Sequence, residues 1–167
     1  RIFGAMVHFA RGTVRNPSEV SLRHATDGAL AIFREGLERR GVRLVLDVPD
    51  DLPQIVAVQA DVEQLLLNLI SNARDATGPE DEVVIRATSS GNAIELMVQD
   101  TGCGMTREHL SKIQEPFFTT KQDGHGLGLA ICRSIVAQLR GQFHIESAPG
   151  AGTCVRAVLP IPEGGVA

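Results

Sequence analysis

The stretch DVEQLLLNLISNARDAT (residues 61–77) predicts a helix with two distinct faces. Its apolar residues recur at three- and four-residue spacing and form one wide stripe: Val62, Leu65, Leu66, Leu69, Ile70 and Ala73. Its polar residues recur at spacings of four, four and three and form a second stripe: Gln64, Asn68, Asn72 and Asp75. Asp61 is placed to serve as the N-cap or as a first-turn acid.

The polar stripe has two interpretations. Solvated helix faces usually carry Lys and Glu, and Asn is a poor helix former that gains nothing on such a face. Asn68 and Asn72, one turn apart, can both offer carbonyl oxygens to a hard cation such as Mg²⁺. Taken alone, the stripe leaves a solvated face and a metal site equally open.

Outward from this helix, helical and strand patterns are mixed along the chain. Helices are predicted at residues 1–12, 22–40, 106–113 and 127–139, and strands at 42–48, 82–88, 93–100, 142–148 and 152–160. Residues 14–22 suit a linker or short strand, and the proline-containing segment 49–55 suits a loop. The turn sequences SSGN and PGAG make the last four strands two antiparallel hairpins. The pattern predicts an α+β fold with helices on one face of a mixed sheet.

Composition limits the class of protein. The chain has 167 residues and 43% apolar residues, which suits one domain with at most a helical appendage. Its net charge is −4, and basic residues form no patch, so nucleic acid is not an expected partner. The three cysteines are far apart, which indicates reduced thiols in a cytoplasmic setting. No apolar run approaches the roughly 20 residues that span a bilayer; the chain begins mid-helix, as a piece of a parent that could itself be membrane-anchored.

The segment AIELMVQDTGCGM (residues 93–105) ends a strand on a carboxylate. Asp100 continues the parity of Ile94, Leu96 and Val98, so it points toward the core, where a carboxylate needs a hydrogen-bond donor. The exocyclic amine of a purine would supply one. A strand that simply ends in an Asp-Thr-Gly turn explains the same residues.

Two more glycine segments follow. In GHGLGLAI (residues 124–131), alternate glycines open onto a helix N-terminus, where free N–H groups favour an anion. The spacing matches neither the dinucleotide fingerprint nor a Walker loop. The segment GAGT (residues 150–153) alone reads as a plain hairpin. Between them, EPFFTTK (residues 115–121) places two adjacent Phe in an otherwise loop-like region.

The order of these segments is more specific than any one of them. It resembles the ATP-binding catalytic domain of sensor histidine kinases, in the superfamily that includes gyrase, heat-shock chaperone and mismatch-repair ATPases. The resemblance covers residues 19–160, with the Asn pair as N box, residues 115–121 as F box and the glycine segments as glycine boxes. The sequences NARDA and EPFFTTK are most similar to the nitrogen-regulation-like and dicarboxylate-sensor-like branch.

The resemblance implies a two-layer α/β sandwich of the Bergerat type, with three main helices on a mixed, largely antiparallel sheet. Asn72 would coordinate Mg²⁺, and Asp100 would accept the adenine amino group with Thr153 nearby. Lys121 would bring positive charge to the phosphates, and Asn72 and Lys121 are the expected catalytic residues. The whole expected nucleotide-binding set is Asn68, Asn72, Asp75, Asp100, Gly102, Gly104, Met105, Lys121, Gly124, His125, Gly126, Leu127, Gly128, Leu129 and Thr153.

The resemblance also implies a division of the chain. Residues 1–14 would end the second helix of a truncated dimerisation hairpin, and 15–167 would form the ATP-binding domain with a lid at about 105–124. Phe117 and Phe118 would anchor that lid when it closes. In the family the acceptor histidine is followed directly by Glu or Asp; here His8 is followed by Phe9, so His8 is not the expected acceptor. The expected partners are therefore the missing acceptor helix of the same parent, a response-regulator receiver domain and a second parent subunit.

Two positions depart from the family pattern. Asp75 stands where many relatives have a basic residue, and His125 stands where Thr or a small residue is common. A titrating imidazole beside the phosphates would make nucleotide affinity pH-sensitive. The alternatives to an active kinase are a catalytically silent regulatory module of the same fold and a different ATPase of the superfamily.

Overall fold

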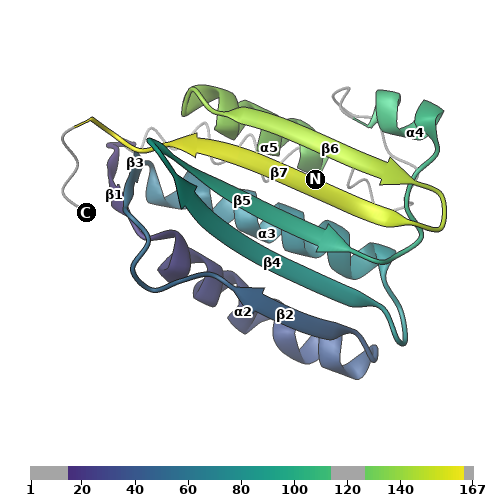
Figure 1. Cartoon of the computed structure of the whole chain (residues 1–167). Coiled ribbons are helices and arrows are strands. Elements are labelled where there is room, and N and C mark those ends of the chain that lie inside the picture. Colours follow the sequence, from purple (N-terminus) through teal and green to yellow (C-terminus); the bar gives the residue numbers. More distant parts are fainter. Residues whose placement is uncertain (1–14, 114–126, 164–167) are drawn as a thin grey trace.

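The computed structural model describes residues 15–113 and 127–163, which form two sheets and four helices (Figure 1). The helices are α2 (Leu22–Arg39), α3 (Gln59–Ala76), α4 (Arg107–Lys112) and α5 (Leu127–Gln138). The strands are β1 (Ser18–Val20), β2 (Arg43–Asp47), β3 (Ile55–Ala57), β4 (Glu82–Ser90), β5 (Ala93–Asp100), β6 (Gln142–Ala148) and β7 (Gly152–Pro160). No helix in these ranges is both long and apolar enough to cross a membrane.

The main sheet has five strands in the order β2-β4-β5-β7-β6. Only β2 and β4 pair in parallel; β4–β5, β5–β7 and β6–β7 are antiparallel. The short strands β1 and β3 form a separate antiparallel pair. The predicted mixed, largely antiparallel sheet is therefore confirmed.

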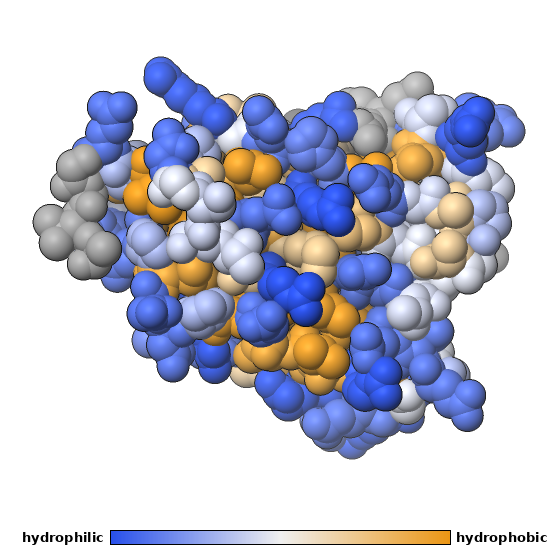
Figure 2. Space-filling view, in the orientation of Figure 1, coloured by the Kyte–Doolittle hydropathy of each residue, from blue (hydrophilic) through white to orange (hydrophobic). Residues whose placement is uncertain are grey.

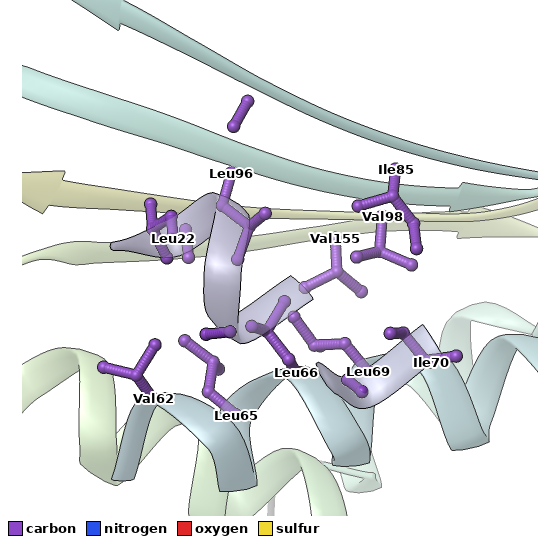
Figure 3. Close-up of a cluster of buried hydrophobic side chains, with 14 of the residues drawn as sticks. Leu22, Val62, Leu65, Leu66, Leu69, Ile70, Ile85, Leu96, Val98 and Val155 are labelled. Atoms are coloured by element: carbon purple, nitrogen blue, oxygen red, sulfur yellow. The ribbon is translucent and has the colours of Figure 1, made fainter. Parts of the chain in front are cut away.

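Helices α2, α3 and α5 lie behind the main sheet in Figure 1, with α3 between the other two and in contact with both. The apolar stripe of α3 faces the sheet (Figure 3): Val62, Leu65, Leu66, Leu69 and Ile70 lie against Ile85, Leu96, Val98 and Val155. Full burial of a large aliphatic side chain contributes about 1.5–3 kcal/mol, so this layer dominates the folding free energy. The stripe that predicted the helix is thus the centre of the core of a two-layer sandwich.

None of the four described helices covers the opposite face of the main sheet. In Figure 2, hydrophilic side chains lie across it with apolar side chains visible between them. Ion pairs cross the strands here: Asp47 pairs with Arg86 at 2.9 Å, and Arg156 lies 3.4 Å from Glu146. Cross-strand charge pairs of this kind cover the sheet without a second layer.

Most predicted boundaries agree with the structure. Strands β5, β6 and β7 have the expected bounds, and the helices differ from expectation by one or two residues at either end. Asp61 lies in the first turn of α3, where Val58 is the N-cap, so its role as a first-turn acid is the one the structure adopts. Strand β3 was not predicted; its first residue, Ile55, falls in the expected loop. The predicted helix at 1–12 lies outside the described residues.

Candidate functional site

A row of three polar residues crosses the end of the main sheet on its helix-covered side. Asp100 pairs with Thr153 across β5 and β7, and Thr153 pairs with Ser147 across β7 and β6. The next row inward, Val98, Val155 and Ile145, is apolar. The strands that build the core therefore bring three hydrogen-bonding groups together where the core ends.

Asp100 is the buried acid of this row, with a side chain only 6% exposed. Burial raises its pKa, and the charge of Asp81 acts in the same direction. Backbone N–H groups of Gly102 and Thr153 lower the pKa in part, and the Gly102 amide nitrogen lies 2.9 Å from Oδ1. The carboxyl is held by fixed backbone donors in a site poor in water, which suits recognition of one further donor.

The glycines around Asp100 are required by close backbone approach. A Cβ on Gly102 would overlap the carbonyl oxygen of Ala76, the last residue of α3. Gly104, with φ of 67°, would overlap the carbonyl oxygen of Ala148, and Gly152, with φ of 80°, that of Asp100. The loop is also tied down by its backbone, because Cys103 N–H donates to the Ala76 carbonyl. These contacts seat the predicted glycine loop tightly between α3 and the β6–β7 turn.

Ser147 is a member of the row that sequence reasoning did not single out. Its hydroxyl accepts a hydrogen bond from the Met105 amide at 2.9 Å and donates to the Gly152 carbonyl at 3.0 Å. It also lies 2.8 Å from the hydroxyl of Thr153. The strand register that places it opposite Thr153 is the signal that would have found it, because the GAGT turn sets that register.

The polar stripe of α3 faces the first turn of α5. Gln64 donates to Oδ1 of Asn68 at 2.9 Å, and Nδ2 of Asn68 lies 3.5 Å from the Gly128 carbonyl. The position of a Cβ on Gly128 would be 3.7 Å from Nδ2 and 3.8 Å from Oδ1 of Asn72. The two predicted Asn residues are therefore brought together with the start of the predicted phosphate-binding helix.

Asp75 lies one turn beyond Asn72, and its carboxylate is 3.1 Å from the Arg74 guanidinium. The same guanidinium stands 5.0 Å from the centre of the Phe33 ring on α2, a cation–π distance. The Arg74 side chain is thus directed toward α2, away from the α5 side of α3 where Asn68 lies. The positive charge of Arg74 compensates the negative charge of Asp75, which stands where many relatives have a basic residue.

Helix α3 connects the two parts of the site. Asn72 faces the start of α5, and Ala76, one turn later, contacts the glycine loop after Asp100. The predicted residues form two groups, Asn68, Asn72 and Gly128 at one end and Asp100, Gly102, Gly104, Met105 and Thr153 at the other. Asp75 pairs with Arg74, and Leu129 lies buried in α5. Lys121, Gly124, His125 and Gly126 lie outside the described residues, as do Phe117 and Phe118, and Leu127 is described only as the first residue of α5.

An α/β sandwich with a buried acid, a tight glycine loop and an Asn-bearing helix defines a class of ATP-binding domains. The chain belongs to the family of histidine kinase-, DNA gyrase B- and HSP90-like ATPases, whose sequence pattern matches residues 57–163. Membership implies that the domain binds ATP. The expected family and fold class are both confirmed.

The relatives include sensor histidine kinases. The chain is 31% identical over 161 residues to the sensor histidine kinase ZraS of Escherichia coli K12, covering 96% of this chain and 35% of ZraS. It is 33% identical over 155 residues to the C4-dicarboxylate transport sensor DctB of Rhizobium meliloti, covering 92% of this chain and 24% of DctB. The chain thus spans about a third or less of the length of these relatives.

Solved structures agree with this assignment. The nucleotide-free catalytic domain of histidine kinase ThkA has a TM-score of 0.79 at 27% identity, covering 88% of this chain and 99% of that one. Full-length ShkA in complex with AMPPNP has a TM-score of 0.76 at 27% identity, covering 93% of this chain and 34% of that one. The fold of the chain is therefore similar to that of histidine kinase catalytic domains.

Proposed function

We propose that this domain binds Mg-ATP between α3, α5 and the ends of β5 and β7, and transfers the γ-phosphoryl group to a histidine. The observation that carries the proposal is the position of α3. Within one helical turn it contacts the glycine loop after Asp100, through Ala76, and faces the start of α5, through Asn72. An adenine base bound at Asp100 and phosphates bound at the start of α5 would then both lie along α3.

The two ends of this site differ chemically, as a nucleotide requires. At one end, Asp100 and Thr153 offer acceptors for the amino group of adenine. At the other, the N-terminus of the twelve-residue helix α5 has backbone N–H groups without partners in its own helix, which favours phosphate. ShkA, to which the chain is similar, holds the ATP analogue AMPPNP.

Asn72 is the residue we propose as the Mg²⁺ ligand. Mg²⁺ keeps several waters and binds through one or two protein oxygens together with substrate phosphates, so one amide oxygen facing α5 suits it. In the described parts of the chain there is no cluster of three or more His, Cys, Asp or Glu that could hold a metal by itself. The cation would supply charge neutralisation for the phosphates.

The acceptor in this proposal is an imidazole on a helical hairpin of the same parent protein. Because the nucleophile comes from elsewhere, the domain contributes positioning and charge stabilisation. Residues 1–14 would be the end of that hairpin, and 15–167 the ATP-binding domain. The next partner would be the receiver domain of a response regulator; ThkA has been solved in complex with its response regulator TrrA.

Calorimetric titration of the chain with AMPPNP, with and without Mg²⁺, tests the nucleotide site. Wild type is expected to bind in a Mg²⁺-dependent manner, and Asn72→Ala to lose that dependence. Asn92→Ala, in the β4–β5 turn at the other end of β5, is the matched control and should bind as wild type does. A folded wild-type chain that binds no nucleotide would contradict the proposal and favour a silent regulatory module.

Phosphotransfer needs the full-length parent. Incubation with γ-labelled ATP is expected to give an acid-labile, base-stable phosphoprotein, the behaviour of phosphohistidine. The Asn72→Ala parent should give none. A label stable to acid would contradict a histidine acceptor.

A further inference from the structure

The hydrogen bonds around Ser147 restrict what its neighbour Thr153 can do. Ser147 has one hydroxyl proton, and the Gly152 carbonyl, 3.0 Å away, can only accept. The Met105 amide, 2.9 Å away, can only donate, so it takes one lone pair of Ser147. With its proton directed to Gly152, Ser147 has only an acceptor left for Thr153.

We assign the Ser147 proton to the Gly152 carbonyl; the Thr153 hydroxyl, 2.8 Å from Ser147, is then the donor in their contact. A threonine hydroxyl that has donated its proton can only accept from any other group. Thr153 neighbours Asp100 across the β5–β7 pair, and the Asp100 carboxylate is also an acceptor. The end of the sheet therefore presents two acceptors side by side to whatever binds there.

We propose that Ser147 is a positioning residue that holds Thr153 as an acceptor and so makes the site selective for a purine with an exocyclic amino group at position 6. This rests on the proposed nucleotide site. The amino group of adenine is a donor at this position, either directly or through a water, whereas guanine carries a carbonyl oxygen there. Two fixed acceptors bind the adenine amino group. They repel the guanine carbonyl oxygen, and the buried acceptors left without a donor make guanine binding costly.

A second contact of Ser147 must be separated from this effect. Its bond to the Met105 amide fixes the start of the segment predicted to be the lid, so removing the hydroxyl could change the affinity for every nucleotide. Such a general loss cancels in the ratio of two affinities. The quantity that reports on Thr153 is therefore the ratio of the dissociation constants for GMPPNP and AMPPNP.

The experiment is calorimetric titration of the whole chain with these two analogues in the presence of Mg²⁺. Ser147→Ala frees the Thr153 hydroxyl to rotate and donate, so the GMPPNP/AMPPNP ratio should fall by about fivefold to tenfold, the equivalent of one hydrogen bond. Ser89→Ala makes the same change at an exposed position of β4 and should leave the ratio unchanged.

A double-mutant cycle separates positioning from a structural role. Thr153→Val removes the hydroxyl from a β-branched side chain and should lower the ratio by itself. In that background Ser147→Ala should change the ratio no further, whereas in a Thr153→Ser background it should still lower it. The inference would be overturned if Ser147→Ala lowered the ratio further in the Thr153→Val background, or if Ser147→Ala alone left the ratio unchanged. Neither result would contradict the nucleotide site itself.

A wild-type chain that binds neither analogue would instead overturn the proposed function, and the selectivity with it. Amide exchange in the nucleotide-free chain still tests the hydrogen-bond assignment in that case. Ser147→Ala should increase the exchange rate of the Met105 amide relative to Ser89→Ala. Equal rates would show that the Ser147 hydroxyl does not hold Met105, which contradicts the assignment from which the role of Thr153 follows.

Discussion

The side-chain amide of Gln64 donates a hydrogen bond to Oδ1 of Asn68, 2.9 Å away and one turn along α3. On its other side Asn68 faces two acceptors, the Gly128 carbonyl at 3.5 Å and the thiol of Cys132. Because both of these groups accept hydrogen bonds, the Asn68 amide must direct Nδ2 toward them, and Oδ1 then faces Gln64. One lone pair of the Asn68 oxygen is thus used within the protein, which is why we assign the cation to Asn72.

Gln64→Met should weaken binding of Mg-AMPPNP by about threefold to tenfold. Asn68 would lose the bond that fixes its amide beside Gly128, at the start of the proposed phosphate-binding helix. The stability of the domain should not change, since Gln64 is exposed. Titration calorimetry and thermal unfolding measure the two quantities separately.

The matched control is Gln59→Met on the same helix, where the Gln59 amide bonds Glu63 at 3.0 Å in the first turn. This variant should bind nucleotide as wild type does. If both substitutions reduce affinity equally, the effect belongs to helix α3 in general and not to the orientation of Asn68.

Gly102→Ala should destabilise the domain by roughly 1–3 kcal/mol, the usual cost of forcing an extra methyl group into a packed site. The new Cβ overlaps the carbonyl of Ala76, and neither backbone segment can move without disturbing the other. Nucleotide binding should fall as well, because the loop after Asp100 would be displaced. Chemical denaturation followed by circular dichroism gives the stability change.

Gly28→Ala is the opposite case and serves as control. Gly28 lies inside α2, and a Cβ there has nothing within 4 Å. Alanine should stabilise the helix by about 0.5–1 kcal/mol. A neutral Gly102→Ala together with a stabilising Gly28→Ala would mean that the glycine loop is looser than its contacts indicate.

The sequence alone predicted the elements that its periodic patterns define. The stripe from Val62 to Ala73 and the alternation in β5 both follow from burial of one face, so their bounds are close to those observed. Strand β3 follows two prolines and pairs with β1, far away in the sequence, so no local pattern indicated it. Long-range pairing of three residues leaves little trace in composition.

The site was predictable to the extent that its residues follow a motif. The inward parity of Asp100 was visible in the sequence and is confirmed by its burial. Ser147 belongs to no motif, and only the strand register places it beside Thr153. Gln64 can be assigned a role only once the structure shows that it bonds Asn68, whose amide lies beside Gly128. Hydrogen-bond direction depends on neighbours from other elements, which a single sequence does not specify.

Cysteine alkylation should distinguish three environments: the exposed thiol of Cys103, the half-buried thiol of Cys154 and the buried thiol of Cys132. Cys103 is exposed in the glycine loop, whereas Cys132 is buried in α5, where burial raises its thiol pKa to about 12. Because the thiolate is the reactive form, Cys132 at pH 8 should react about 10⁴-fold more slowly than a fully ionised thiol, and in practice only on unfolding. Mass spectrometry of iodoacetamide-treated protein measures the order of labelling.

The same labelling tests the nucleotide site. Mg-AMPPNP should slow modification of Cys103, which lies between Gly102 and Gly104, and leave that of Cys154 unchanged. Cys154 lies on the opposite face of β7 from Thr153 and provides the internal control. Protection of both thiols, or of neither, would contradict a nucleotide bound at the glycine loop.

Asp100→Asn should stabilise the nucleotide-free domain at neutral pH. Burial raises the folded-state pKa of Asp100 above its unfolded value, so the folded protein binds more protons between those two pKa values. Stability contributed by this group is therefore complete below the ordinary carboxyl range and is lost as pH rises through the folded pKa. At neutral pH the wild type carries the full cost of a buried carboxylate, which the neutral amide avoids.

The stabilisation by Asp100→Asn should therefore disappear as pH falls below the ordinary carboxyl pKa, where the wild-type acid is protonated in both states. Unfolding midpoints of wild type and variant, measured from about pH 3 to pH 8, should converge at the acidic end. Nucleotide affinity should fall in the variant at neutral pH, since an amide nitrogen repels the amino group that a carboxylate accepts. A variant that is less stable than wild type at pH 8 would show that the bonds from Gly102 and Thr153 outweigh the cost of burial.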